Sequence, residues 1–240
     1  MLPASIDNVV FTNSAEERHL KRLVPGELAF PSHAKSGVIL YGKYGTGKTT
    51  LAHLLAVLLE NQLAEALDKK AYNWCYDYRS TQVSVTPEQT EAPCVTPASF
   101  TLINCGKHHS NSSTSVVQRI DEVSRQSLKY GCVAGSFNHF VLDELDCWSE
   151  AAQANLKGVI TESPSWNVFY VTTNKRHAID EGIISRCVSV EMNGSDAQQH
   201  MRVLRQHYEH LTKYTDEQLT GVVSASGGDW RELEDAVCRL

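Results

Sequence analysis

The sequence lacks any apolar run close to the roughly 20 residues that cross a bilayer. Residues 1–7 also lack the basic region and apolar core of a secretory signal peptide. We therefore expect no membrane partner and a soluble, reducing compartment, either cytoplasmic or nuclear.

Regular cysteine spacing is missing too. The seven cysteines form no C-x-x-C pair and no even framework, which argues against a zinc site and against a disulfide scaffold. They are Cys75, Cys94, Cys105, Cys132, Cys147, Cys187 and Cys238.

Positive charge is not in excess. The 22 Lys and Arg residues against 28 Asp and Glu residues leave a net charge of −6. This balance argues against a protein that coats nucleic acid by bulk charge, although it leaves a local basic patch open. With 240 residues, 42% of them hydrophobic, the chain can bury a full core.

The most informative motif is a phosphate loop. Residues 42–49 read G-K-Y-G-T-G-K-T and fit the pattern G-x-x-x-x-G-K-[S/T] at every fixed position. The apolar run 37–41 predicts a buried strand before the loop, and leucines at i, i+3, i+4 and i+7 predict an amphipathic helix after it. Together, strand, loop and helix N-terminus make an anion site.

We therefore expect ATP and Mg²⁺ as cofactors. Lys48 should neutralise the β- and γ-phosphates, and Thr49 should bind the magnesium ion. The residues expected to hold the nucleotide are Gly42, Lys43, Tyr44, Gly45, Thr46, Gly47, Lys48, Thr49 and Thr50.

Strand and helix signals alternate along the first 192 residues. Buried strands are predicted at 37–41, 100–104, 139–143, 167–172 and 187–191, and helices at 115–130 and 149–162. This alternation predicts an α/β fold, a three-layer parallel sheet of the P-loop NTPase class. Three further helices, predicted at 196–211, 216–225 and 229–240, suggest a small helical lid over residues 193–240.

Residues 71–98 interrupt this rhythm and are expected to form a surface insertion. Aromatic residues gather in the first part of the segment, and prolines mark the second part. The aromatic residues could form a partner-docking patch or a small satellite core.

A second nucleotide signature follows the predicted strand 139–143. Its end carries two adjacent carboxylates, Asp143 and Glu144. Asp143 is expected in the magnesium shell, and Glu144 is expected to polarise the attacking water. A third signature is Thr173-Asn174 at the next strand end, where the amide of Asn174 could bind both γ-phosphate and water. The alternative for Asn174 is an ordinary turn.

At these motifs the chain resembles the AAA+ ATPases, and within them the small subunits of the clamp loader replication factor C. The resemblance covers most of the chain apart from the insertion. Asn174 stands where that family has sensor 1. Residues 184–187, I-S-R-C, are similar to the S-R-C motif, and residues 226–231, S-G-G-D-W-R, are similar to the sensor 2 segment.

The resemblance implies roles for three more residues. Arg186 would reach the ATP site of a neighbouring subunit, unless it forms a surface ion pair. Arg231 would sense the γ-phosphate from the lid. Asn104 would restrain the catalytic Glu144. With Glu144 and Asn174, these arginines complete the expected catalytic set.

The chain also departs from the family pattern. Clamp-loader subunits continue into a helical collar, whereas this chain ends within or just after the sensor 2 helix. It would therefore be either a fragment or a compact relative that assembles differently. The insertion is likewise unlike the short connection expected there.

Two weaker patterns lie around residue 110. Lys107, Arg119, Arg125 and Lys129 could follow a DNA backbone, as the corresponding region of clamp loaders does, or form a solvated helix face. His108-His109 near Cys105 could suggest a metal site, although adjacent histidines in a polar turn are usually solvated.

We therefore expect an ATP-hydrolysing motor or switch in DNA replication. Its partners would be other AAA+ subunits in a homo- or hetero-oligomer with shared sites, DNA, and a replication protein such as a sliding clamp or a helicase. The alternatives are a helicase loader, a transposition regulator, or a nucleotide-dependent assembly scaffold with little turnover.

Overall fold

The computed structural model describes residues 5–12, 14–24, 30–32, 34–66, 74–76, 83–85, 100–107, 116–123, 137–163, 166–194 and 196–240. Most of the expected insertion at 71–98 lies outside these residues. Its described part is a two-stranded antiparallel pair, β2 (Trp74–Tyr76) and β3 (Val83–Val85).

Five parallel strands form the main sheet, in the order β4-β5-β6-β1-β7. Numbered among themselves along the chain, they follow the order 2-3-4-1-5. The parallel sheet confirms the predicted α/β class. Each predicted strand is confirmed to within one residue. The strands are β1 (Gly37–Tyr41), β4 (Phe100–Asn104), β5 (Asn138–Asp143), β6 (Asn167–Thr173) and β7 (Cys187–Glu191).

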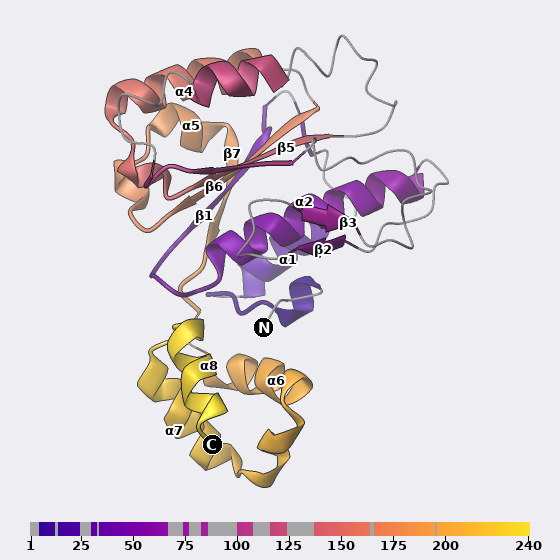
Figure 1. Ribbon diagram of the computed structural model, residues 1–240, viewed down its shortest axis with the longest axis vertical. Coiled ribbons are helices and arrows are strands. Elements are labelled where there is room, and N and C mark those ends of the chain that lie inside the picture. The colour runs from indigo at the N-terminus through magenta and orange to yellow at the C-terminus, as the bar shows by residue number, and fades with distance from the viewer. Residues whose placement is uncertain are drawn as a thin grey trace.

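Helices cover both faces of this sheet (Figure 1). Helices α1 (Ser14–Leu23) and α2 (Lys48–Ala66) lie on one face, and α4 (Glu150–Glu162) and α5 (Glu181–Ser185) lie on the other. Separate apolar clusters fill the two interfaces. Because β6 is covered on both faces, all seven of its residues are buried, which explains the apolar run Val168–Val171 at its centre.

The sequence patterns did not predict α1, which covers the edge strand β7. Side chains form hydrogen bonds with backbone groups of β7 that face away from the sheet. Lys35 Nζ donates to the carbonyl of Cys187 at 2.7 Å, and Thr12 Oγ1 donates to the carbonyl of Glu191 at 2.9 Å. The carboxylate of Glu16, on α1, accepts from the backbone N–H of Glu191. These contacts occupy groups that another strand could otherwise pair with.

The C-terminal helices pack around their own apolar cluster. They are α6 (Ala197–His207), α7 (Asp216–Ser226) and α8 (Trp230–Cys238). The prediction of one helix over 196–211 is wrong at its C-terminal end, because α6 stops at His207 and a 3₁₀ helix, η6 (Glu209–Lys213), follows. The guanidinium of Arg205 donates to the carbonyls of Leu211 and Tyr214, which folds this segment back on α6.

These helices also contact the sheet domain through polar groups. Arg202 donates to the carbonyl of Asp7 at 3.1 Å, and Asn8 Nδ2 donates to Gln206 Oε1 at 2.9 Å. Within the described ranges, no helix has both the length and the apolar character needed to cross a bilayer.

Candidate active site

A cavity of about 370 Å³ lies at the carboxyl edge of the sheet. Such edges are where open α/β sheets bind their ligands. Four parts of the chain line this cavity: the glycine loop with the start of α2, the ends of β5 and β6, the first turns of α8, and the N-terminal segment. The lining residues are Asn8, Val9, Tyr44, Gly45, Thr46, Gly47, Lys48, Thr49, Thr50, Asp143, Glu144, Thr172, Asn174, Trp230, Arg231 and Glu234.

The glycine loop runs from β1 into α2 in a conformation that needs glycine. Gly45 has φ 71°, in the left-handed region where other residues are strained. At Gly42 a side-chain carbon would lie 2.6 Å from Asn193 Oδ1 and 2.7 Å from the carbonyl of Met192. The loop therefore packs closely against the segment that follows β7, and Asn193 Oδ1 accepts from the backbone N–H of Lys43 at 2.6 Å.

Lys48 lies inside the loop and is 8% exposed. Its Nζ donates to the carbonyl of Gly42 at 2.9 Å and also contacts the carbonyl of Lys43. Burial lowers the pKa of Lys48 to about 8, while the carboxylates of Asp143 and Asp146 oppose this shift. The loop carbonyls thus solvate an ammonium group at the floor of the cavity.

Two hydroxyl groups and one carboxylate form hydrogen bonds with each other next to Lys48. Thr49 Oγ1 donates to Asp143 Oδ1 at 2.6 Å, and Thr172 Oγ1 donates to the same oxygen at 2.7 Å. Oxygen ligands of this kind suit Mg²⁺, which takes one or two protein ligands and completes its shell with water and phosphate. Thr49 and Asp143 therefore fit the magnesium pair expected from the sequence. No group of three or more His, Cys, Asp or Glu side chains with metal-binding geometry occurs among the described residues.

Glu144 has a left-handed backbone, with φ 60° and ψ 49°. Its backbone N–H donates to Thr172 Oγ1 at 3.0 Å, which anchors this turn to β6. Its carboxylate lies above Gly106, where an added side-chain carbon would come within 2.7 Å of Glu144 Oε2 and 3.3 Å of Asn104 Oδ1. Asn104 Oδ1 itself accepts from the backbone N–H of Lys107 at 3.0 Å. Glu144 and Asn104 are thus neighbours across Gly106.

Asn174 and Arg231 also line the cavity. Asn174 follows the last residue of β6, beside Thr172. Arg231 lies in the first turn of α8, and Asp229 caps that helix by accepting from the backbone N–H of Arg231 at 2.8 Å.

Arg186 is the one expected catalytic residue that does not line this cavity. It follows α5, and its guanidinium donates to the carbonyl of Gly182 at 2.7 Å. Among the described residues no carboxylate forms an ion pair with Arg186, so that part of the chain gives no partner for the alternative of a surface ion pair.

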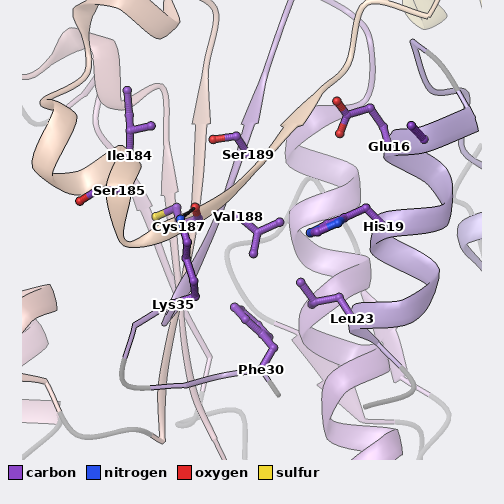
Figure 2. Close-up of a pocket in the computed structure, with 11 residues that line it drawn as sticks. Glu16, His19, Leu23, Phe30, Lys35, Ile184, Ser185, Cys187, Val188 and Ser189 are labelled. Carbon is purple, nitrogen blue, oxygen red and sulfur yellow. Dashed lines mark hydrogen bonds between the residues drawn. The ribbon is translucent and has the colours of Figure 1, made fainter. Parts of the chain in front are cut away.

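A second cavity, of about 740 Å³, lies beside Arg186 between α1 and β7 (Figure 2). His19 and Leu23 on α1 face Val188 on β7, and Phe30 and Lys35 border the same space. Its lining contains neither the glycine loop nor the carboxylates of the first cavity. Although it is larger, it lacks the phosphate loop and the magnesium ligands expected of a nucleotide site.

The basic residues expected to contact DNA are only partly described. Lys107 and Arg119 are exposed, while Arg125 and Lys129 lie outside the described residues. His108 and His109 lie outside them as well. Cys105 is buried, and burial raises the pKa of its thiol, which disfavours the thiolate that binds metals.

The sequence patterns missed several residues of the cavity. Thr172 is the last residue of the predicted strand 167–172, and its position next to Thr173-Asn174 was the available signal. Asn8, Val9 and Glu234 carry no local signal, because only the packing of distant segments brings them to the loop. Trp230 lies inside residues 226–231, the segment expected to correspond to sensor 2, and was not itself expected at the site.

The sequence matches no family model and no curated protein. Solved structures do share the fold at low identity. A single-substitution variant of RuvB from Thermotoga maritima aligns with a TM-score of 0.60 and 13% identity, over 97% of this chain and 63% of that chain. PCH-2 from C. elegans aligns with a TM-score of 0.56 and 14% identity, over 92% of this chain and 61% of that chain.

This chain therefore spans less than two thirds of the length of those structures. At such identity the similarity concerns the fold alone. Together with the strand order and the C-terminal helices, it shows that this chain has an AAA+-like fold.

Proposed function

We propose that this protein binds ATP with Mg²⁺ and hydrolyses it, as a motor or switch of the clamp-loader kind. One observation carries the proposal: Thr49, at the start of α2, donates to Asp143 Oδ1 at 2.6 Å in the cavity that Asn174 and Arg231 also line. A hydroxyl, a carboxylate, an amide and a guanidinium thus converge beside a phosphate loop. Phosphoryl transfer needs little else from a protein, because it depends on positioning and charge stabilisation.

The cavity suggests how the nucleotide would lie. Phosphates would bind the loop N–H groups and the N-terminus of α2, with Lys48 exchanging its carbonyl partners for phosphate oxygens. Asn8, Val9 and Trp230 line the cavity along with the loop, and Val9 and Trp230 would supply an apolar and aromatic surface for the base.

The side chains divide the proposed chemistry among them. Thr49 and Asp143 would hold Mg²⁺, which neutralises charge on the phosphates when bound. Glu144 would polarise the attacking water, and Asn174 would orient it. Arg231 would contact the γ-phosphate from the C-terminal helices, which makes residues 193–240 a lid on the core formed by residues 1–192.

Arg186 extends the proposal to an oligomer. Since it does not line the cavity of its own chain, it would act on the ATP of a neighbouring subunit. An arginine supplied in this way is worth roughly 10³–10⁵ in rate. Arg186 would thus make the site a shared one in a homo- or hetero-oligomer.

A role on DNA is the finer part of the proposal. One structure with a similar fold, T. maritima RuvB, is a Holliday junction branch migration motor. The motif resemblance favours a replication factor C-like role, with a sliding clamp or a helicase as protein partner. A helicase loader, a transposition regulator and a nucleotide-dependent scaffold with little turnover are the alternatives.

Paired variants test the proposal. ATP binding and hydrolysis are measured with and without primed DNA, alongside the mass of the assembly. Lys48→Ala should bind no nucleotide, because a phosphate charge is lost. Glu144→Gln should bind ATP normally and stop turnover, because only the water-polarising group is lost. Normal turnover in Glu144→Gln would refute the assignment of Glu144, and binding without turnover in the wild type would favour the scaffold.

A further inference from the structure

The fully buried Thr173 joins three parts of the candidate site. Its carbonyl accepts from the backbone N–H of Gly42, the first residue of the glycine loop, at 3.3 Å. Its hydroxyl donates to Asp146 Oδ1 at 2.9 Å and accepts from the backbone N–H of Lys175 at 3.0 Å. Thr173 therefore links the loop, the turn after β5 and the turn after β6.

Asp146 is the partner of Thr173 on the turn after β5. It lies in the 3₁₀ helix η4 (Leu145–Cys147), which begins directly after Glu144. The same oxygen, Oδ1, also accepts from the backbone N–H of Asn174 at 3.4 Å. One carboxylate oxygen thus holds both Thr173 and the backbone of Asn174.

These contacts tie two proposed catalytic groups to each other. Glu144 and Asp146 share one short turn, so a shift of that turn moves both residues. The carboxylate of Asp146 accepts from the backbone N–H of Asn174, so it holds the turn after β6 against the turn that carries Glu144. Hydrogen bonds to an ionised carboxylate are stronger than those between neutral groups, which makes this anchor stiffer than a threonine contact alone.

We propose that Asp146, acting through Thr173, is a positioning residue that holds the Asn174 amide in register with Glu144 for attack by water. This inference rests on the proposed ATPase function. Asp146 is not among the residues that line the cavity, so it acts through Thr173 and Asn174 and not by touching the nucleotide. A displacement of about 1 Å in a reacting group can cost about 10²-fold in rate, so the effect falls on turnover.

The test uses four variants of the full chain. Asp146→Ala and Thr173→Val each remove one side of the contact, while Asp146→Asn and Thr173→Ser keep an acceptor oxygen and a hydroxyl. We expect kcat to fall by about tenfold or more in the first two, with KM and the affinity for a non-hydrolysable ATP analogue within about twofold of wild type. Thr173→Ser should restore turnover, and Asp146→Asn should turn over faster than Asp146→Ala.

Two further readouts separate positioning from a general loss of structure. The double variant Asp146→Ala with Thr173→Val should lose less turnover than the product of the two single losses, because both substitutions remove the Asp146–Thr173 contact. Hydrogen exchange of the backbone amides at 172–175 should quicken in Asp146→Ala without nucleotide. Glu150→Ala, which removes an exposed carboxylate from the nearby α4, is the matched control and should leave kcat unchanged.

The outcomes distinguish this inference from the proposed function. If wild type hydrolyses ATP and Asp146→Ala does so at the same rate, the inference fails and the function stands. If Asp146→Ala loses analogue affinity and thermal stability together, and Thr173→Ser rescues nothing, Asp146 is only structural and the inference again fails. If the wild type hydrolyses no ATP, the proposed function fails and takes the inference with it.

Discussion

The backbone N–H of Trp230 donates a hydrogen bond to the backbone carbonyl of Gly45 at 3.0 Å, joining the first turn of α8 to the middle of the glycine loop. Asp229 lies against the same glycine, and a side-chain carbon on Gly45 would come within 2.0 Å of its carboxyl carbon. The ring of Trp230 packs on His200 of α6, with 4.8 Å between ring centroids. The C-terminal helices therefore touch the loop that we propose binds phosphate.

We expect Gly45→Ala to disturb both elements. The new methyl group would collide with Asp229, and φ 71° would be strained for alanine, so either the loop or α8 must move. The affinity for an ATP analogue should fall by about tenfold or more, consistent with a backbone strain of about 1–3 kcal/mol. Titration of the analogue, with tryptophan fluorescence as a second signal, measures this.

Gly221→Ala is the matched control, because a side-chain carbon there meets nothing within 4 Å and the residue lies within α7. It should bind the analogue normally and gain about 0.5–1 kcal/mol in stability. Adding Asp229→Ser to Gly45→Ala should recover part of the affinity, since serine can still cap α8 and occupies less space. Wild-type affinity in Gly45→Ala would show that this contact is unimportant.

The affinity for nucleotide should depend on pH through Lys48. Burial lowers the pKa of Lys48 to about 8 in the protein without nucleotide. The charged form that binds phosphate then predominates at pH 7, is half present near pH 8 and is largely lost by pH 9. Between pH 7 and pH 9 the affinity for ADP should fall by about tenfold.

Lys48→Arg provides the comparison for this titration. Arginine stays charged throughout the range, so its binding, even if weaker, should vary little between pH 7 and pH 9. A wild-type affinity that is constant over this range would contradict the assignment of Lys48 as the phosphate-binding cation.

Mixing two inactive variants tests the shared site. Arg186→Ala should bind ATP almost normally and lose about 10³-fold or more in turnover, while Lys48→Ala should bind none. In a mixed oligomer, an intact loop from the first meets an intact arginine from the second. Random mixing of equal amounts should therefore restore roughly a quarter of the wild-type activity.

Specific activity of the wild type should also rise with protein concentration as the oligomer forms. The shared-site proposal loses its support if activity per chain is constant on dilution and mixing restores nothing.

Outside the cavity, the buried contact between Glu60 and His139 should contribute strongly to the free energy of unfolding. Glu60 on α2 and His139 on β5 are each 2% exposed, and Glu60 Oε1 lies 2.8 Å from His139 Nε2. The same oxygen accepts from the backbone N–H of Phe137 at 2.7 Å, and His139 Nδ1 lies 2.9 Å from the Tyr170 hydroxyl.

Glu60→Leu would keep the volume and remove the acceptor, so it should cost about 3–5 kcal/mol in the free energy of unfolding. Denaturant titration measures this, with the exposed Glu162→Ala as a control that should change stability by no more than about 0.5 kcal/mol. A loss below about 1 kcal/mol in Glu60→Leu would show that the contact contributes little.

Local patterns in the sequence determined the strands of the main sheet and most of its helices, although not α1. The strand from Gly37 to Tyr41 and the helix after Lys48 follow from an apolar run, a glycine loop and leucine spacing, all within about 20 residues. The alternation of later strands and helices predicted the parallel sheet, because parallel strands need helical crossovers. The motif carboxylates Asp143 and Glu144 could be assigned to one sheet edge for the same reason.

Tertiary structure alone decided which distant groups touch. Nothing near Asn8 or Glu234 in the sequence marks them as part of the cavity, and the pairing of Asp146 with Thr173 joins turns 27 residues apart. The end of α6 at His207 also depends on contacts made by Arg205 with later residues. Side-chain periodicity specifies which face of an element is buried, whereas the packing of whole elements specifies what that face meets.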